Sequence, residues 1–200
     1  MNEEKRMAQN YEIIQAVRIG GREVVLGRDE SSDEPYLCAF YSENSLFYEY
    51  SDCMVGSYAE ILKLFGERIQ AQAEAVMEEQ KRVSVPLEPL TETDCYPNDY
   101  SQSIDGKVVA IKQTSLAPEY RTAIHQLVLV DGGSGSRANA RGNACFCINL
   151  YSGEHTRWER YDIQGEVRPE RLPEWAKERV AEVRREQAER IRKREAREVR

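Results

Sequence analysis

The stretch YLCAFYSENSLFYEY at 36–50 is the clearest structural signal in the chain and indicates its fold class. Aromatic and apolar residues fill 36–41 and 46–50, and the polar tetrapeptide at 42–45 separates them. Two β-prone runs joined by a short polar turn are typical of an antiparallel hairpin. Upstream, two further β-prone runs at 11–17 and 23–26 flank Gly20 and Gly21, which tolerate the positive φ of a tight turn and predict another hairpin.

A long amphipathic helix is expected to follow the hairpins. Ser57 and Glu60 have the spacing of a capping box, in which the two residues satisfy each other's backbone amides. Apolar residues then recur at steps of three and four from Tyr58 to Val76, which gives the helix one apolar face. We expect this helix to cover one face of the sheet and to end near Arg82.

The second half predicts another small β unit. Strand-like runs at 107–112, 124–130, 144–151 and 155–163 are interrupted by a glycine-rich loop that begins at Asp131. Such short strands favour a small antiparallel sheet or an SH3-like barrel. Pro173 suits the first turn of a closing helix, and charged residues dominate that helix as far as Arg200.

The chain is therefore expected to be an α+β protein with two small modules. Residues 1–82 are predicted to form an acidic hairpin module, an antiparallel sheet packed by one amphipathic helix. A proline-rich stretch at 83–105 has no hydrophobic period and predicts an extended linker. Residues 106–172 are expected to form the small β module, and residues 173–200 the charged C-terminal helix.

The composition limits the classes of function. The chain has 200 residues, 28 of them basic and 35 acidic, and its net charge of −7 argues against a uniformly basic nucleic-acid binder. Residues 1–100 hold 20 acids and 9 bases, whereas residues 101–200 hold 15 acids and 19 bases. No apolar run approaches the roughly 20 residues of a membrane span, and the N-terminus lacks the apolar stretch of a secretory signal. These features and an odd number of cysteines, five, predict a cytoplasmic protein with reduced thiols.

The strongest anomaly is an acidic stretch rich in tyrosine. Eight acids and no Lys or Arg lie between Asp29 and Leu62, together with five tyrosines. Carboxylates spread over a hairpin present charge much as phosphates do, and tyrosines add rigid contact area. The predicted partner-binding residues are Asp29, Glu30, Asp33, Glu34, Tyr36, Tyr41, Glu43, Tyr48, Glu49, Tyr50 and Asp52. The alternative is a sheet whose acidic face is simply solvated.

Basic residues in the second half are candidate nucleic-acid contacts. They lie on the glycine-rich loop, the strand after it and the last helix: Arg137, Arg141, Arg157, Arg160, Arg190, Lys193 and Arg194. Together such residues neutralise phosphates with an affinity that falls as salt rises. A solvated helix end and loop are the alternative.

Metal and catalytic chemistry receive less support from the sequence. Cys145 and Cys147 share one face of a predicted strand, and with His125 and His155 they are candidate zinc ligands; the alternative is that the thiols are buried and reduced. The glycine-rich loop is expected to join two antiparallel strands, whereas a phosphate-binding loop leads from a strand into a helix. Two histidines and mostly exposed carboxylates favour a non-enzymatic chain with no cofactor and no metal.

Part of the second half carries a resemblance. The segments LAPEYR at 116–121, HQLVL at 125–129, ARG at 140–142, SGE at 152–154 and LPEWA at 172–176 resemble small uncharacterised accessory proteins of conjugative and other mobile elements from gut Gram-positive bacteria. The resemblance brings no catalytic residue. It implies a genetic context that includes anti-CRISPR and anti-restriction proteins.

The charge map and this context together predict a non-catalytic anti-defence protein. The leading hypothesis is an anti-CRISPR-type inhibitor that acts as a DNA mimic, binds an RNA-guided nuclease through the acidic, tyrosine-rich surface and blocks nucleic-acid loading. The expected partner is a host CRISPR effector nuclease or another defence protein, and no membrane is involved. Two alternatives stay open: a nucleic-acid-binding accessory protein of element transfer that uses the basic C-terminal half, and a zinc-stabilised adaptor.

Overall fold

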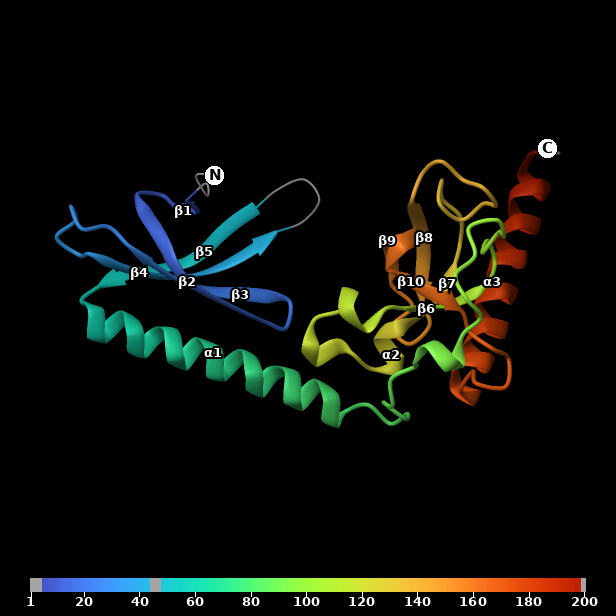
Figure 1. Ribbon diagram of the computed structural model, residues 1–200, viewed down its shortest axis with the longest axis horizontal. Coiled ribbons are helices and arrows are strands. Elements are labelled where there is room, and N and C mark those ends of the chain that lie inside the picture. Colours follow the sequence, from blue (N-terminus) through green and yellow to red (C-terminus); the bar gives the residue numbers. More distant parts are fainter. Residues whose placement is uncertain (1–4, 44–47, 199–200) are drawn as a thin grey trace. The chain divides into compact units, whose positions relative to one another are not determined.

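The chain folds into two compact units, residues 1–84 and residues 85–200, which we call unit 1 and unit 2 (Figure 1). The computed structural model describes residues 5–43 and 48–198, without the side chains of residues 190, 191 and 194–198. Each unit contains a five-stranded antiparallel sheet. The predicted α+β class with two small modules is thereby confirmed.

Unit 1 is a meander of five strands covered by one long helix (Figure 1). Its elements are β1 (Met7–Ala8), β2 (Tyr11–Ile19), β3 (Arg22–Arg28), β4 (Tyr36–Glu43), β5 (Tyr48–Gly56) and α1 (Tyr58–Lys81). Both predicted hairpins form, and Gly20 has the positive φ, 66°, that its turn requires. The last hairpin is longer than expected, because β5 continues to Gly56; the predicted start of its second strand at 46–47 lies outside the described residues.

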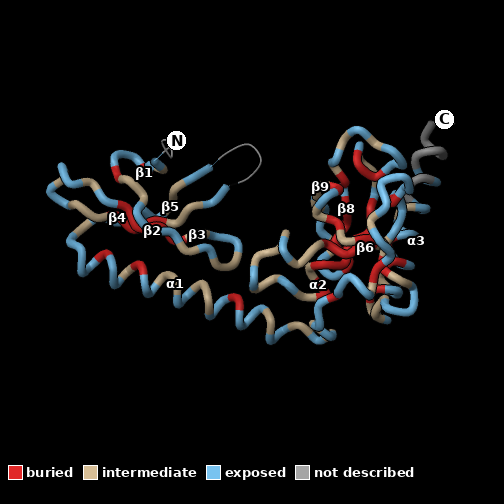
Figure 2. The backbone as a smooth tube through the Cα atoms, in the orientation of Figure 1, coloured by how far each residue is buried: buried red, intermediate tan, exposed pale blue. Residues whose placement is uncertain are grey.

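The two faces of this sheet bury different clusters. On one face Val24, Leu26 and Cys38 pack against Ile61 and Phe65 of α1, and Ser57 with Glu60 forms the predicted capping box at the start of that helix. On the other face the strands bury a smaller cluster that includes Ala8, Tyr11, Val25, Leu37 and Ala39. Figure 2 shows the buried residues of unit 1 concentrated in the strands and in turns of the helix. The helix therefore covers only one side of the sheet.

A bulge in the last hairpin is tied to the helix. The register of β4 and β5 shifts between Cys38 and Phe40, and Asp52 opposite them has a positive φ of 50°. Arg68 on α1 donates to the backbone oxygens of Asp52 at 2.7 Å and of Cys38 at 3.1 Å. These bonds hold the hairpin against the helix where the ladder is interrupted.

The elements of unit 2 are η1 (Glu92–Asp94), β6 (Val108–Ile111), η2 (Gln113–Ser115), η3 (Pro118–Tyr120), α2 (Ala123–Gln126), β7 (Leu127–Val130), β8 (Ala144–Asn149), β9 (His155–Glu159), η4 (Arg160–Asp162), β10 (Ile163–Glu166) and α3 (Glu174–Glu198). Its strands are ordered β10-β6-β7-β8-β9 in the sheet, and the 3₁₀ turn η4 lies directly before β10. A five-strand meander whose last strand returns to the first is the order expected of an SH3-like barrel. Both faces of this sheet are covered by apolar clusters, one of them built with Ala176, Val180 and Val183 of α3.

Two of the predicted strands in unit 2 are divided. Residues 124–126 form a helical turn before β7, because Thr122 accepts backbone bonds from His125 and Gln126. The run at 155–163 is broken by η4, in which the backbone amide of Glu159 donates to the Asp162 carboxylate at 3.2 Å. The break lets the chain turn and pair β10 with β6.

The segment expected to be a separate linker belongs mostly to unit 2. Leu90, Cys95 and Ile104 are buried in the clusters of that unit, and Cys95 forms a β-bridge with Val167. Unit 2 accordingly begins at Val85 instead of Gly106. Isolated apolar residues between prolines have no period, so the sequence pattern does not indicate that they pack. No helix within the described residues is long and apolar enough to cross a membrane.

Candidate partner-binding surface

One end of the unit 1 sheet presents three tyrosines on the face away from α1. Tyr41 and Tyr50 are cross-strand partners on β4 and β5, and Tyr48 lies two residues from Tyr50 on the same face. Their ring centroids lie between 5.1 and 6.5 Å apart. Tyr48 is 70% exposed, whereas Tyr41 and Tyr50 are half-buried. Because side chains alternate between the two faces of a strand, the three tyrosines gather on one face of this hairpin.

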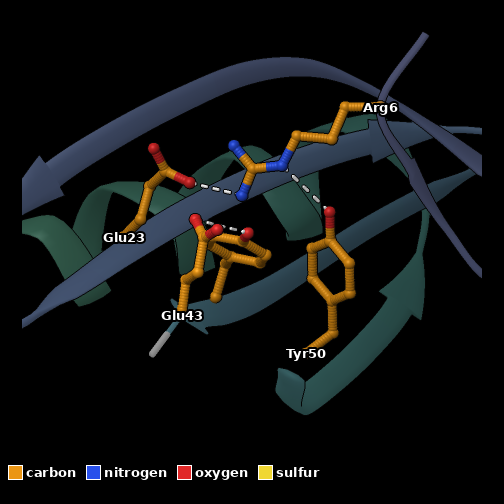
Figure 3. A network of polar contacts seen from close by, with 5 residues as sticks. Arg6, Glu23, Glu43 and Tyr50 are labelled. Atoms are coloured by element: carbon orange, nitrogen blue, oxygen red, sulfur yellow. Dashed lines mark hydrogen bonds and ion pairs between the residues drawn. The ribbon is translucent and has the colours of Figure 1, made fainter. Parts of the chain in front are cut away.

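Arg6 lies across this aromatic cluster. Its guanidinium carbon is 3.8 Å from the centroid of the Tyr41 ring, and its Nε donates to the Tyr50 hydroxyl at 3.0 Å. Its Nη2 forms an ion pair with Glu23 on β3, whose side chain is 14% exposed. Figure 3 shows Arg6 reaching between Glu23 and Tyr50. The guanidinium is thus held by a ring, a carboxylate and a hydroxyl at once.

Glu43 ends β4 beside the cluster, directly opposite Tyr48. The Tyr41 hydroxyl donates to Glu43 Oε2 at 3.0 Å. Desolvation and this hydrogen bond raise the pKa of Tyr41, so the phenol remains a donor to a higher pH than that of an ordinary tyrosine. Among the residues that the structure describes, no cation pairs with Glu43. We call the group Arg6, Glu23, Tyr41, Glu43, Tyr48 and Tyr50 the tyrosine face.

Four of the predicted acids lie at the opposite end of β4, in the loop at 29–35: Asp29, Glu30, Asp33 and Glu34. The length of β4 places this loop about 23 Å from Glu43. Asp29 accepts bonds from the hydroxyl and backbone amide of Ser31, which lower the pKa of its carboxyl. Glu30 forms an ion pair with Arg28 at 3.2 Å. The loop is a second acidic region, separate from the tyrosine face.

The remaining predicted residues belong to neither region. Tyr36 packs on the α1 side of the sheet, where its ring centroid is 4.9 Å from that of Tyr58. Glu49 neighbours Tyr48 in sequence but faces the opposite side, and Asp52 lies in the bulge. The eleven predicted residues therefore form two separate regions and a remainder, instead of one continuous acidic surface.

The charge difference between the halves changes when it is counted by unit. Residues 1–84 hold 16 acids and 9 bases, a net charge of −7, whereas residues 85–200 hold 19 of each and are neutral. These net charges differ from those of residues 1–100 and 101–200, because four acids of the expected linker lie in unit 2: Glu88, Glu92, Asp94 and Asp99. The whole net charge of the chain is that of unit 1.

Arg160 is not a surface residue, contrary to the prediction. Its side chain is 1% exposed and donates to Asn98 Oδ1 and to the backbone oxygens of Asp99, Gln102 and Gly135 at 2.9–3.2 Å. These acceptors come from two segments that are distant in the sequence. Arg160 therefore braces unit 2 from inside and is unable to contact a nucleic acid.

The other predicted basic contacts lie on separate elements. Arg137 and Arg141 are exposed on the loop between β7 and β8, and Arg157 on β9 forms an ion pair with Glu159 at 2.5 Å. Lys193 is exposed on α3, whereas the side chains of Arg190 and Arg194 lie outside the described residues. The glycine-rich loop joins two antiparallel strands, as predicted.

The four candidate zinc ligands are not brought together. Cys145 and Cys147 are buried in an apolar cluster, and burial raises the pKa of both thiols, that of Cys147 to about 12. His155 pairs with Ile148 and so points to the other face of the sheet from Cys147. His125 contacts Tyr120 and Thr122. No group of three or more metal-binding side chains was found in the described part of the chain.

Sequence reasoning missed Arg6 and Glu23, the two residues that complete the tyrosine face. Arg6 precedes a strand of only two residues, which is too short to show a period. Glu23 lies on β3 directly opposite Tyr41. It could have been predicted as a neighbour of Tyr41 only from the register between the two predicted hairpins. That register needs the pairing of β3 with β4, which the sequence does not specify by itself.

The comparisons with known proteins returned nothing: no protein-family model, curated protein or solved structure matches the chain. The resemblance to mobile-element accessory proteins therefore stays a prediction.

Proposed function

We propose that the chain is a non-catalytic anti-defence protein of the anti-CRISPR type, which binds an RNA-guided nuclease and blocks the loading of its nucleic acid. One observation carries this proposal: in a unit of net charge −7, a cluster of three tyrosines, with Tyr48 70% exposed, adjoins Glu43, whose carboxylate pairs with no cation among the described residues. Tyrosines on a rigid sheet contribute contact area with little loss of side-chain entropy. The mobile-element origin rests on the sequence resemblance alone.

The physical basis is charge complementarity with a nucleic-acid channel. Such channels are lined by Lys and Arg, so an acidic unit is attracted to them at long range and associates faster at low salt. The tyrosine face supplies the short-range contacts, and the loop at 29–35 adds charge at a distance of about 23 Å along β4. Two acidic regions at such a spacing suit a broad basic channel better than a single small pocket.

The test is competition for a panel of purified RNA-guided nucleases. The protein is expected to prevent guide or target loading, and joint reversal of Asp33, Glu34, Glu43 and Glu49 to Lys is expected to abolish inhibition. Reversal of four exposed acids on α1, Glu67, Glu74, Glu78 and Glu79, to Lys is the matched control for net charge and should leave most inhibition intact. Full inhibition by the first variant would rule out the acidic surface as the binding site.

A second candidate function rests on unit 2. Phe146 on β8 is 53% exposed and stands directly opposite Arg157 on β9, with Arg137 and Arg141 on the preceding loop. An exposed ring beside cations is a usual platform for single-stranded nucleic acid. Retention of the full chain on single-stranded DNA, lost in the Phe146→Ala variant, would support this function. Passage through the column at low salt would exclude it.

A further inference from the structure

The tyrosine face contains the same arrangement twice. Glu23 on β3 stands directly opposite Tyr41 on β4, and Glu43 on β4 stands directly opposite Tyr48 on β5. Both pairs lie on the face away from α1, because Tyr41 and Glu43 are two residues apart on one strand. Side chains directly opposite in an antiparallel ladder have Cβ atoms about 5 Å apart, so each pair presents a carboxylate beside a phenol ring.

The first pair is occupied by a guanidinium of the chain itself. Arg6 stacks on the ring of Tyr41 and forms an ion pair with Glu23, and its Nε also donates to Tyr50. Burial by itself lowers the pKa of Arg6, but its bonds to Glu23 and Tyr50 outweigh this effect and the pKa is raised. This pair therefore demonstrates which group fits between a carboxylate and a tyrosine on this surface.

The second pair holds no cation among the described residues. Tyr48 is 70% exposed, and no described cation stacks on its ring or pairs with Glu43. The other arginine on this face, Arg18, lies on β2, three strands from Tyr48 and hence about 14 Å away. Tyr41 donates to one carboxylate oxygen of Glu43, and no donor among the described residues occupies the other oxygen, which can accept from an external donor.

We propose that Glu43 and Tyr48 bind an arginine side chain of a partner protein, in the way that Glu23 and Tyr41 bind Arg6. Arginine suits the pair better than lysine, because a planar guanidinium stacks on a phenol ring and donates two parallel bonds to a carboxylate. This inference rests on the proposed function, since it names the group on the partner that the tyrosine face recognises.

The test uses the full chain and a blocked peptide of four arginines, followed by amide chemical shifts. Saturable shifts are expected around Glu43 and Tyr48. The Glu43→Gln and Tyr48→Leu variants should bind the peptide roughly fivefold more weakly, the size of one exposed ion pair or cation–π contact. Glu43→Gln keeps the shape of the side chain and an acceptor for Tyr41, so it is expected to fold normally.

Two controls make the result specific. Glu49→Gln changes the same charge one residue from Tyr48 but on the opposite face, and it should leave the affinity within about twofold. A peptide of four citrullines, which has the shape of the arginine peptide without its charge, should not bind, and four lysines should bind more weakly. Equal affinities for the Glu43→Gln and Glu49→Gln variants, or shifts confined to the loop at 29–35, would overturn the proposal.

The outcome is separable from that of the proposed function. If the arginine peptide binds at Glu43 and Tyr48 but no nuclease is inhibited, the site stands and the anti-CRISPR proposal fails. If nucleases are inhibited but the peptide shifts map elsewhere, the site fails and the broader proposal stands.

Discussion

The two units each fold five antiparallel strands, yet they use arginine in opposite ways. In unit 2, Arg160 is enclosed by backbone oxygens and an asparagine, and its side chain is hidden from solvent. In unit 1, Arg6 lies on a sheet face among tyrosines and a carboxylate, where part of the cluster remains exposed. A buried arginine that satisfies backbone carbonyls fixes one conformation, whereas an arginine on an aromatic face leaves neighbouring groups accessible to a partner. Arg160 therefore braces unit 2 from inside, whereas unit 1 keeps Tyr48 exposed beside Glu43 on the face that we propose binds a partner.

Replacing Phe65 with Ala tests whether each unit has its own core. Phe65 is 4% exposed between α1 and the sheet, and its loss should destabilise unit 1 by about 4 kcal/mol. Both tryptophans, Trp158 and Trp175, lie in unit 2, so their fluorescence reports that unit alone. In urea, the circular dichroism of the variant should show unit 1 unfolding at a lower urea concentration than in the wild type. The fluorescence transition of unit 2 should be unchanged. A shift of the fluorescence transition would show that the units unfold together.

Replacing Arg160 with Met makes the reverse test in unit 2. Four side-chain hydrogen bonds disappear and the buried carbonyl of Gly135 loses its side-chain donor, at a cost of about 3 kcal/mol. The fluorescence transition should move to lower urea. Arg157→Met, on an exposed side chain of the same unit, is the control and should change stability by no more than about 0.5 kcal/mol. Similar results for the two variants would contradict the bracing role of Arg160.

The stability of unit 2 should fall at alkaline pH because of its buried thiols. Burial raises the pKa of Cys147 from 9.0 to about 12, so the folded state retains a proton that the unfolded state loses. The protonated Cys147 thiol therefore stabilises the folded unit fully below pH 9. This stabilisation is lost progressively as the pH rises toward 12, by about 1.4 kcal/mol per pH unit. Urea unfolding at pH 8, 9 and 10 should show a steeper decline in the wild type than in Cys147→Ala. Parallel declines would contradict the burial of this thiol.

Replacing Arg6 with Ala should destabilise unit 1 less than Phe65→Ala does. Arg6 is partly exposed, and its ion pair and ring contact together contribute about 1 kcal/mol to unit 1. Circular dichroism in urea measures this change. Lys5→Ala, which removes an exposed ion pair with Glu12, is the matched control and should change less. A loss as large as that of Arg160→Met would show that Arg6 is a structural brace as well.

Much of the fold follows from local sequence signals. The Ser57 capping box and its apolar stripe predict α1 nearly to the residue, and the run at 36–41 predicts β4. These signals are local because a helix face and a hairpin are specified by neighbours in the chain. The packing of the segment at 85–105 was not predictable in this way, because its buried residues Leu90 and Cys95 contact residues distant in the sequence.

The candidate site was predictable only in part. The local composition predicted the tyrosines and Glu43, but the register of the strands decides which acids share a face of the sheet. Glu49, one residue after Tyr48, lies on the opposite face. Arg160 appeared to be a surface cation because nothing in a polar strand indicates that backbone oxygens from 99, 102 and 135 will surround it. Hydrogen bonds to backbone oxygens that are distant in the sequence leave no recognisable pattern of residue types.

The most direct test of the account compares two single charge reversals in the nuclease-loading assay. Glu43→Lys and Glu49→Lys change the net charge of unit 1 equally, but Glu43 belongs to the tyrosine face and Glu49 lies on the α1 side of the sheet. If the tyrosine face binds the partner, Glu43→Lys should raise the inhibitor concentration needed by at least about tenfold, the expected effect of a like charge in an interface, and Glu49→Lys by about twofold or less. Equal effects of the two reversals would contradict the tyrosine face as the binding surface.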